Sequence, residues 1–156
     1  MAELFTFFEP EAAQRSPLLI SIPHAGTHIP PDVAARMTDE GTSVPDTDWH
    51  VDRLYDFART AGVSVIAATH SRYVVDLNRP PDGKPLYPGA SNTELCPTSS
   101  FGDKPLYVPG NEPDADVVDA RREVYWRPYH DRIEKTLNQL KAQHGFAMLY
   151  DAHSIC

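Results

Sequence analysis

Four residues of the sequence are candidate ligands for a catalytic metal ion. His24 in "PHAG" and His153 in "DAHS" offer imidazole nitrogens, and Asp48 and Asp52 in "DTDWHVD" offer carboxylates. Two imidazoles and one carboxylate are a common protein ligand set for zinc, with water in the fourth position. Asp48 and Asp52 are four residues apart, so they would share one face of a helix. These residues predict a zinc site with one of the two aspartates.

Each of the four residues also has a structural interpretation without a metal. His24 and His153 would then hydrogen-bond to loop backbone, Asp48 would cap the helix that follows it, and Asp52 would lie on a solvated helix face. Because ligands on separate elements have no fixed spacing, the sequence alone leaves both interpretations open. It also leaves open which aspartate completes the ligand set.

The segment "DLNRP" has the residue types of an anion site. An arginine such as Arg79 can bind a carboxylate through two parallel hydrogen bonds, and Asn78 can add its amide. Arg72 precedes Asn78 by six residues and would serve the same anion or pair with a helix acid. Alternatively, Arg79 would form an internal ion pair with Asp76. The segment predicts a site for a small anionic substrate.

These residues require elements that bring them together. Hydrophobic patterning and the positions of proline and glycine predict the following order: strand 17–23, helix 46–62, strand 63–70, strand 71–78, helix 115–145 and strand 146–151. This order predicts an α/β fold with a mainly parallel or mixed sheet flanked by helices. Ligands bind outside the carboxyl ends of such strands, where His24, Arg79 and His153 are expected to meet.

The remaining patterns concern the last helix and one long connection. Ile133, Leu137 and Leu140 form an apolar stripe, and Gly145 follows as a stop signal. Pro128 would either kink this helix or begin a second one. Residues 79–114 are rich in proline and glycine, which predicts a functional lid, a binding loop or disorder.

Composition limits the class of protein. The chain of 156 residues has the length of a single domain, 1–156, and its net charge of −8 disfavours a nucleic-acid partner. No apolar run approaches the roughly 18 residues that span a bilayer, so no membrane partner is expected. Two distant cysteines and an amino terminus without signal-peptide features predict a cytoplasmic protein.

Taken together, four segments resemble one enzyme family. "LLISIPHAGTHIP", "DTDWHVDRLYDFA", "SRYVVDLNRPPDGKPLYPG" and "YHDRIEKTLNQLKAQHGFAMLYDAHS" resemble the N-formylglutamate amidohydrolases of histidine degradation. The resemblance implies a zinc carboxypeptidase-like (phosphorylase/hydrolase-like) fold, similar to that of aspartoacylases. It also implies zinc-dependent hydrolysis of N-formyl-L-glutamate to formate and L-glutamate.

The resemblance assigns roles to individual residues. His24 and His153 would bind Zn²⁺ together with an acid from Asp48 or Asp52. Three further residues would hold a substrate carboxylate, namely Arg72, Asn78 and Arg79. In carboxypeptidase-like enzymes the acidic ligand usually comes three residues after the first histidine, a position that Thr27 occupies in this sequence.

Family members continue well beyond the "DAHS" segment. The resemblance therefore implies that this chain is the amino-terminal part of a domain, with a general-base glutamate beyond Cys156. An incomplete sheet predicts an exposed strand edge through which the chain self-associates. The alternatives are a metal-binding fragment without catalysis, a non-enzymatic small-acid binder that uses Arg79, and a related N-acyl amino acid deacylase.

Overall fold

The centre of the protein is a mixed four-stranded β-sheet. A computed structural model describes residues 3–83 and 94–154 of the chain. The strands are β1 (Phe5–Phe8), β2 (Leu18–Ile22), β3 (Ser64–Ala68) and β4 (Met148–Asp151). They lie in the order β1-β3-β2-β4, with β2 parallel to β3 and β4 and with β1 antiparallel to β3. The mixed sheet was predicted, but β1 was not.

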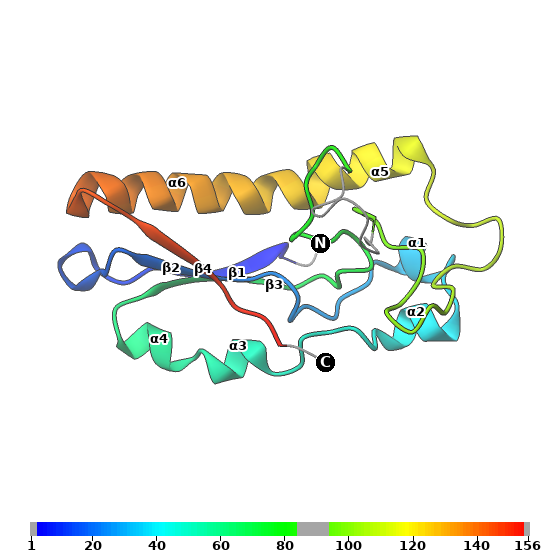
Figure 1. Ribbon diagram of the computed structural model, residues 1–156, viewed down its shortest axis with the longest axis horizontal. Helices are drawn as coiled ribbons and strands as arrows, with labels where there is room; N and C mark the ends of the chain where they lie inside the picture. The colour runs from blue at the N-terminus through cyan, green and yellow to red at the C-terminus, as the bar shows by residue number, and fades with distance from the viewer. Residues whose placement is uncertain (1–2, 84–93, 155–156) are drawn as a thin grey trace.

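Helices cover both faces of this sheet (Figure 1). The long helical segment α5–α6 runs along one face, and α3 and α4 lie on the other. The helices are α1 (Pro31–Ala34), α2 (Asp39–Ser43), α3 (Val51–Leu54), α4 (Phe57–Thr60), α5 (Ala115–Arg121) and α6 (Arg127–His144), with a short 3-10 helix η1 (Ala12–Gln14) and a π-helical turn η2 (Arg122–Trp126). The result is a three-layer α/β arrangement, as the sequence pattern predicted.

The core follows from the alternation of side chains along the central strands. Leu19 and Ile66 point to one face, where they pack in one cluster with Leu140 of α6. Ile20 and Val65 point to the other face and belong to a second cluster beneath α3 and α4. Because both faces are covered, β2 and β3 are apolar nearly throughout, which is typical of buried parallel strands.

The prediction of a strand at residues 71–78 is wrong. The segment is irregular: the Val74 amide donates to the Ser71 carbonyl at 2.9 Å, and the Asp76 amide donates to the Leu95 carbonyl at 2.7 Å. Val74 and Val75 are nevertheless buried. The β-branched residues therefore indicated burial correctly, but burial alone does not create a partner strand.

The predicted helix at 46–62 is two short helices, α3 and α4, separated at Tyr55 and Asp56. The predicted helix at 115–145 is confirmed as the continuous run α5–η2–α6, which ends at Gly145 with φ 83°. Pro128 lies in the first turn of α6, directly after η2.

The prediction that residues 79–114 form a long loop is confirmed for the described residues 79–83 and 94–114, which contain no helix or strand longer than an isolated bridge. Leu106 and Tyr107 are almost completely buried in a third cluster with residues of α1 and its surroundings. This part of the loop therefore belongs to the core. The remaining loop residues, 84–93, lie outside the described residues.

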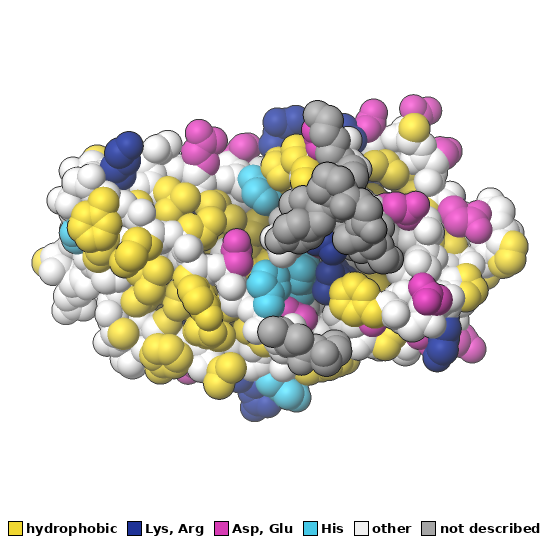
Figure 2. All heavy atoms as spheres, in the orientation of Figure 1, with side chains coloured by type: hydrophobic (Ala, Val, Ile, Leu, Met, Phe, Trp, Pro, Cys, Tyr) yellow, Lys and Arg dark blue, Asp and Glu magenta, His cyan; other side chains and the backbone are white. Residues whose placement is uncertain are grey.

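The predicted strand at the end of the chain forms, but it is not buried. In β4, Met148, Leu149 and Tyr150 are 49%, 44% and 49% exposed, and β4 lies at the edge of the sheet. Figure 2 shows hydrophobic side chains gathered over the left half of the view, where Figure 1 draws β4. Among the described residues, no helix combines the length and apolar character that crossing a lipid bilayer requires.

Candidate metal centre

The carboxyl ends of β2 and β4 carry the two candidate histidines. β2 and β4 are parallel neighbours with Ser21 opposite Asp151, so both strands end at the same edge of the sheet. His24 and His153 each come two residues after the end of their strand. Their ring centroids are 4.9 Å apart. The structure therefore confirms that the sequence brings these two imidazoles together.

Asp48 completes a group of three potential ligands. Its backbone amide donates to the carbonyl oxygen of His24 at 3.0 Å, which ties the loop before α3 to the end of β2. Its Oδ2 lies 3.2 Å from His153 Nδ1 and 3.8 Å from His24 Nδ1. One ligand atom from each of His24, Asp48 and His153 lies within 4.8 Å of the others. We call these residues the His-Asp-His group.

The buried Asp76 carboxylate contacts this group through the ring nitrogen of His24 that does not face Asp48. Its Oδ1 accepts hydrogen bonds from His24 Nε2 at 2.7 Å and from the backbone amide of Asn78 at 2.9 Å. Its Oδ2 accepts from the Arg72 guanidinium at 2.8 Å. Because a carboxylate only accepts, His24 carries its proton on Nε2, and its Nδ1 lone pair faces Asp48. A carboxylate that orients a histidine in this way is typical of metal sites in proteins.

The electrostatics of the group favour the protonation states that metal binding needs. Burial lowers the pKa of His24 and outweighs the raising effect of Asp76, so the imidazole is neutral near pH 7. Burial raises the pKa of Asp48, but hydrogen bonds from the His153 ring and the backbone amide of Ser154 oppose this effect. The pKa of Asp48 is therefore lowered, and its carboxylate is charged. A neutral imidazole and a charged carboxylate are the forms that bind zinc.

The donor set and its spacing fit a zinc ion. Nitrogen ligands about 2.1 Å from a tetrahedral ion lie roughly 3.4 Å from one another. The separations of 3.2 and 3.8 Å between Asp48 and the two imidazoles lie close to this value, and all three ligand atoms lie within 4.8 Å of one another. Two nitrogens and one carboxylate oxygen also match a common set for a zinc that keeps an open position.

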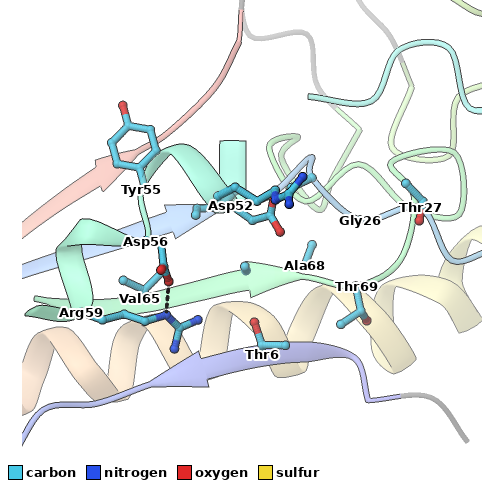
Figure 3. A pocket seen from close by; sticks show the side chains of 14 residues that line it. Thr6, Gly26, Thr27, Asp52, Tyr55, Asp56, Arg59, Val65, Ala68 and Thr69 are labelled. Atoms are coloured by element: carbon cyan, nitrogen blue, oxygen red, sulfur yellow. Dashed lines mark ion pairs between the residues drawn. The ribbon is translucent and has the colours of Figure 1, made fainter. Parts of the chain in front are cut away.

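The structure separates the two candidate aspartates. Asp52 lies on α3, is exposed, and is absent from the His-Asp-His group. It lines a different pocket of about 570 Å³, where Figure 3 shows it with Tyr55 and Arg59. The expectation that Asp48 caps the following helix is wrong, because the N-cap residue of α3 is His50. The structure therefore brings Asp48, and not Asp52, to the histidines.

The three candidate anion-binding residues line the same cleft as the His-Asp-His group. The cleft has a volume of about 360 Å³, and its lining residues are His24, Asp48, Arg72, Asn78, Arg79, Phe101, His153 and Ser154. Arg72 is buried, its guanidinium lies 4.7 Å from the centre of the Phe101 ring, and it pairs with Asp76. Asn78 is exposed, and its Nδ2 lies 3.4 Å from His153 Nε2.

Sequence reasoning missed the role of Asp76, which it treated only as a partner for Arg79. The structure pairs Asp76 with Arg72, leaves it 0% exposed and hydrogen-bonds it to His24. A charged residue within a run of buried β-branched residues was the available signal, because such a residue needs partners. Phe101 was also missed, since no pattern in the loop marks it.

The fold and the site define a class of α/β protein in which a His-Asp-His group and arginines share one cleft at the carboxyl ends of parallel strands. The family model "N-formylglutamate amidohydrolase" matches residues 16–156. The chain therefore belongs to the N-formylglutamate amidohydrolase family.

Two curated relatives are named N-formylglutamate deformylase. The chain is 50% identical to the protein from Pseudomonas putida and 51% identical to the one from Pseudomonas aeruginosa, over 141 residues in each case. These residues are 90% of this chain but 52% and 53% of the relatives. The chain thus spans about half the length of the curated relatives that it matches.

Two crystal structures have a similar fold. One is an N-formylglutamate amidohydrolase from Ralstonia eutropha JMP134, with a TM-score of 0.78 and 28% identity over 97% of this chain and 57% of that one. The other is a gene product of Agrobacterium tumefaciens, with a TM-score of 0.69 and 22% identity over 99% of this chain and 57% of that one.

Proposed function

We propose that this chain carries the zinc-binding and carboxylate-binding half of an N-formyl-L-glutamate hydrolase, whose products are formate and L-glutamate. The observation that carries this proposal is the His-Asp-His group in a cleft that Arg72, Asn78 and Arg79 also line. The names of the Pseudomonas relatives support the choice of substrate.

His24, Asp48 and His153 would hold the zinc ion. A bound zinc supplies an activated water near neutral pH and polarises a carbonyl oxygen. Asp76 fixes the ring of His24 through its 2.7 Å hydrogen bond and so keeps Nδ1 directed at the group. This preorganisation lowers the free-energy cost of assembling the ligands when the ion binds.

Arg72, Asn78 and Arg79 would bind a carboxylate of the substrate. Asn78 and Arg79 come two and three residues after Asp76, so the same carboxylate that orients His24 also anchors the segment that would hold the substrate. Asp76 joins that segment to the His-Asp-His group. The segment would bind the anionic end of the substrate, and this would fix the position of the formyl amide relative to the His-Asp-His group.

The cleft offers no glutamate as a general base among the described residues. A general-base glutamate beyond Cys156 stays a prediction. The proposed half-site accordingly separates into two testable parts, zinc binding and hydrolysis.

The decisive experiment compares two matched substitutions, Asp48→Asn and Asp52→Asn. Each removes one carboxylate from the same short segment, but only Asp48 belongs to the His-Asp-His group. Zinc binding is measured by competition with a chromophoric chelator. We expect one equivalent of zinc in the unaltered protein and in Asp52→Asn, and a large loss of affinity in Asp48→Asn.

Formate release from N-formyl-L-glutamate, assayed with zinc and compared with His24→Ala, tests the hydrolysis. Release by the unaltered chain alone supports the enzyme. If zinc binds at one equivalent while both proteins are inactive, the chain is a metal-binding fragment without catalysis. If zinc does not bind, the metal proposal fails and the small-acid binder that uses Arg79 is favoured.

A further inference from the structure

The helix that covers one face of the sheet contains a π-helical turn, η2. In this turn the Arg127 amide donates to the carbonyl oxygen of Arg122, five residues earlier. Pro128 follows at once and has no amide hydrogen to donate to residue 124, so regular α-helical bonding could not continue through this position. Single π-helical turns occur frequently at functional sites, and the wider turn changes the direction of the side chains on it.

The last residue of this turn, Trp126, is held in place by several contacts. Its indole Nε1 donates to the carbonyl oxygen of Arg79 at 3.0 Å. Its ring stacks on His130 with centroids 3.6 Å apart and an interplanar angle of 14°. His130 Nδ1 lies 2.9 Å from the Trp126 carbonyl oxygen, which can only accept, so His130 donates this bond. These contacts hold the indole against the Arg79 backbone and the His130 ring.

The contact with Arg79 links Trp126 to the cleft. Arg79 lines the cleft, whereas Trp126 does not. The amide of Arg79 donates to the Asp76 carbonyl at 3.2 Å, and its carbonyl accepts from Trp126. The backbone of Arg79 is thus fixed on one side by the residue that orients His24 and on the other by the long helix.

We propose that Trp126 is a positioning residue for substrate binding, which sets the backbone of Arg79 so that Arg79 and Asn78 meet the carboxylate of the substrate. This inference rests on the carboxylate-binding part of the proposed function. Trp126 acts through Arg79 and is not among the residues that line the cleft. Its loss should therefore weaken anion binding and leave zinc binding unchanged.

The test uses Trp126→Phe, which keeps a ring to stack on His130 but removes the indole donor. The matched control is Trp49→Phe at the other tryptophan of the chain, whose side chain is 52% exposed. Binding of L-glutamate, a product that cannot be hydrolysed further, is measured by calorimetry on the zinc-loaded proteins. We expect binding to weaken about fivefold in Trp126→Phe, as for the loss of one hydrogen bond. Trp49→Phe should bind L-glutamate like the unaltered protein, and all three proteins should bind zinc equally.

A second readout does not depend on how Trp126→Phe folds. In Trp49→Phe the only tryptophan is Trp126, so L-glutamate should change its fluorescence. Unchanged fluorescence, equal L-glutamate affinity in Trp126→Phe, or a parallel loss of zinc affinity would each overturn the inference while leaving the proposed function standing. Absence of L-glutamate binding to the unaltered protein would overturn both.

Discussion

Replacing Asp76 by asparagine tests whether one buried carboxylate supports both the fold and the site. Asp76 is 0% exposed and accepts hydrogen bonds from His24, Arg72 and the backbone of Asn78. Asparagine has nearly the same shape but no charge, so Arg72, itself 6% exposed, loses its counter-ion. Breaking a buried ion pair by removing one partner costs about 3–5 kcal/mol of unfolding free energy.

The same substitution should weaken zinc binding. Asp76 accepts from His24 Nε2 and thereby holds the Nδ1 lone pair toward Asp48. Loss of a carboxylate that orients a metal-binding histidine typically costs 10–100-fold in metal affinity, and we expect a loss of about this size in Asp76→Asn.

Urea denaturation of the zinc-free protein measures the first effect, and chelator competition measures the second. Asp52→Asn is the matched control, because an exposed aspartate outside the group should change stability by no more than about 0.5 kcal/mol. Equal stability of Asp76→Asn and Asp52→Asn would refute the ion-pair reasoning. Equal zinc affinity in these two variants would refute the orienting role of Asp76.

The remaining predictions concern the stability of the fold. Burial lowers the pKa of His24, His70 and His130, so the unfolded chain binds more protons than the folded one below about pH 6.5. The zinc-free protein should therefore be less stable to urea at pH 5.5 than at pH 7.5, and equal or greater stability at pH 5.5 would contradict this sign. Leu140→Ala should cost about 2–5 kcal/mol because Leu140 is 0% exposed between α6 and the sheet. Leu149→Ala on the 44% exposed edge strand should cost clearly less by thermal or urea unfolding, and a larger loss there would mean that the edge of β4 is covered.

Much of the site could be predicted because the order of the strands and the residues at their ends are local features. His24 follows β2 and His153 follows β4, and the parallel pairing of these strands brings the two histidines to one edge of the sheet. The stripe of Ile133 and Leu140 likewise predicted which face of α6 packs on the sheet. These predictions needed only the hydrophobic periodicity, the positions of the strand ends and the rule that parallel strands end at the same edge of a sheet.

Other features depended on contacts between distant segments. The sequence left Asp48 and Asp52 equivalent, and only the close approach of the 46–50 loop to His24 placed Asp48 beside the histidines. Residues 71–78 have the composition of a strand, but they fold as buried turns.

The functional side chains are already visible in the sequence: two candidate histidines and several aspartates and arginines lie beside apolar runs whose periodicity predicts an α/β fold. How these side chains pair with one another depends on the tertiary structure. It joined Asp76 to His24 and Trp126 to Arg79, which are 52 and 47 positions apart respectively. The physical reason is that hydrophobic periodicity is a property of neighbouring residues, whereas buried hydrogen bonds depend on which distant donors and acceptors the packed elements bring within about 3 Å.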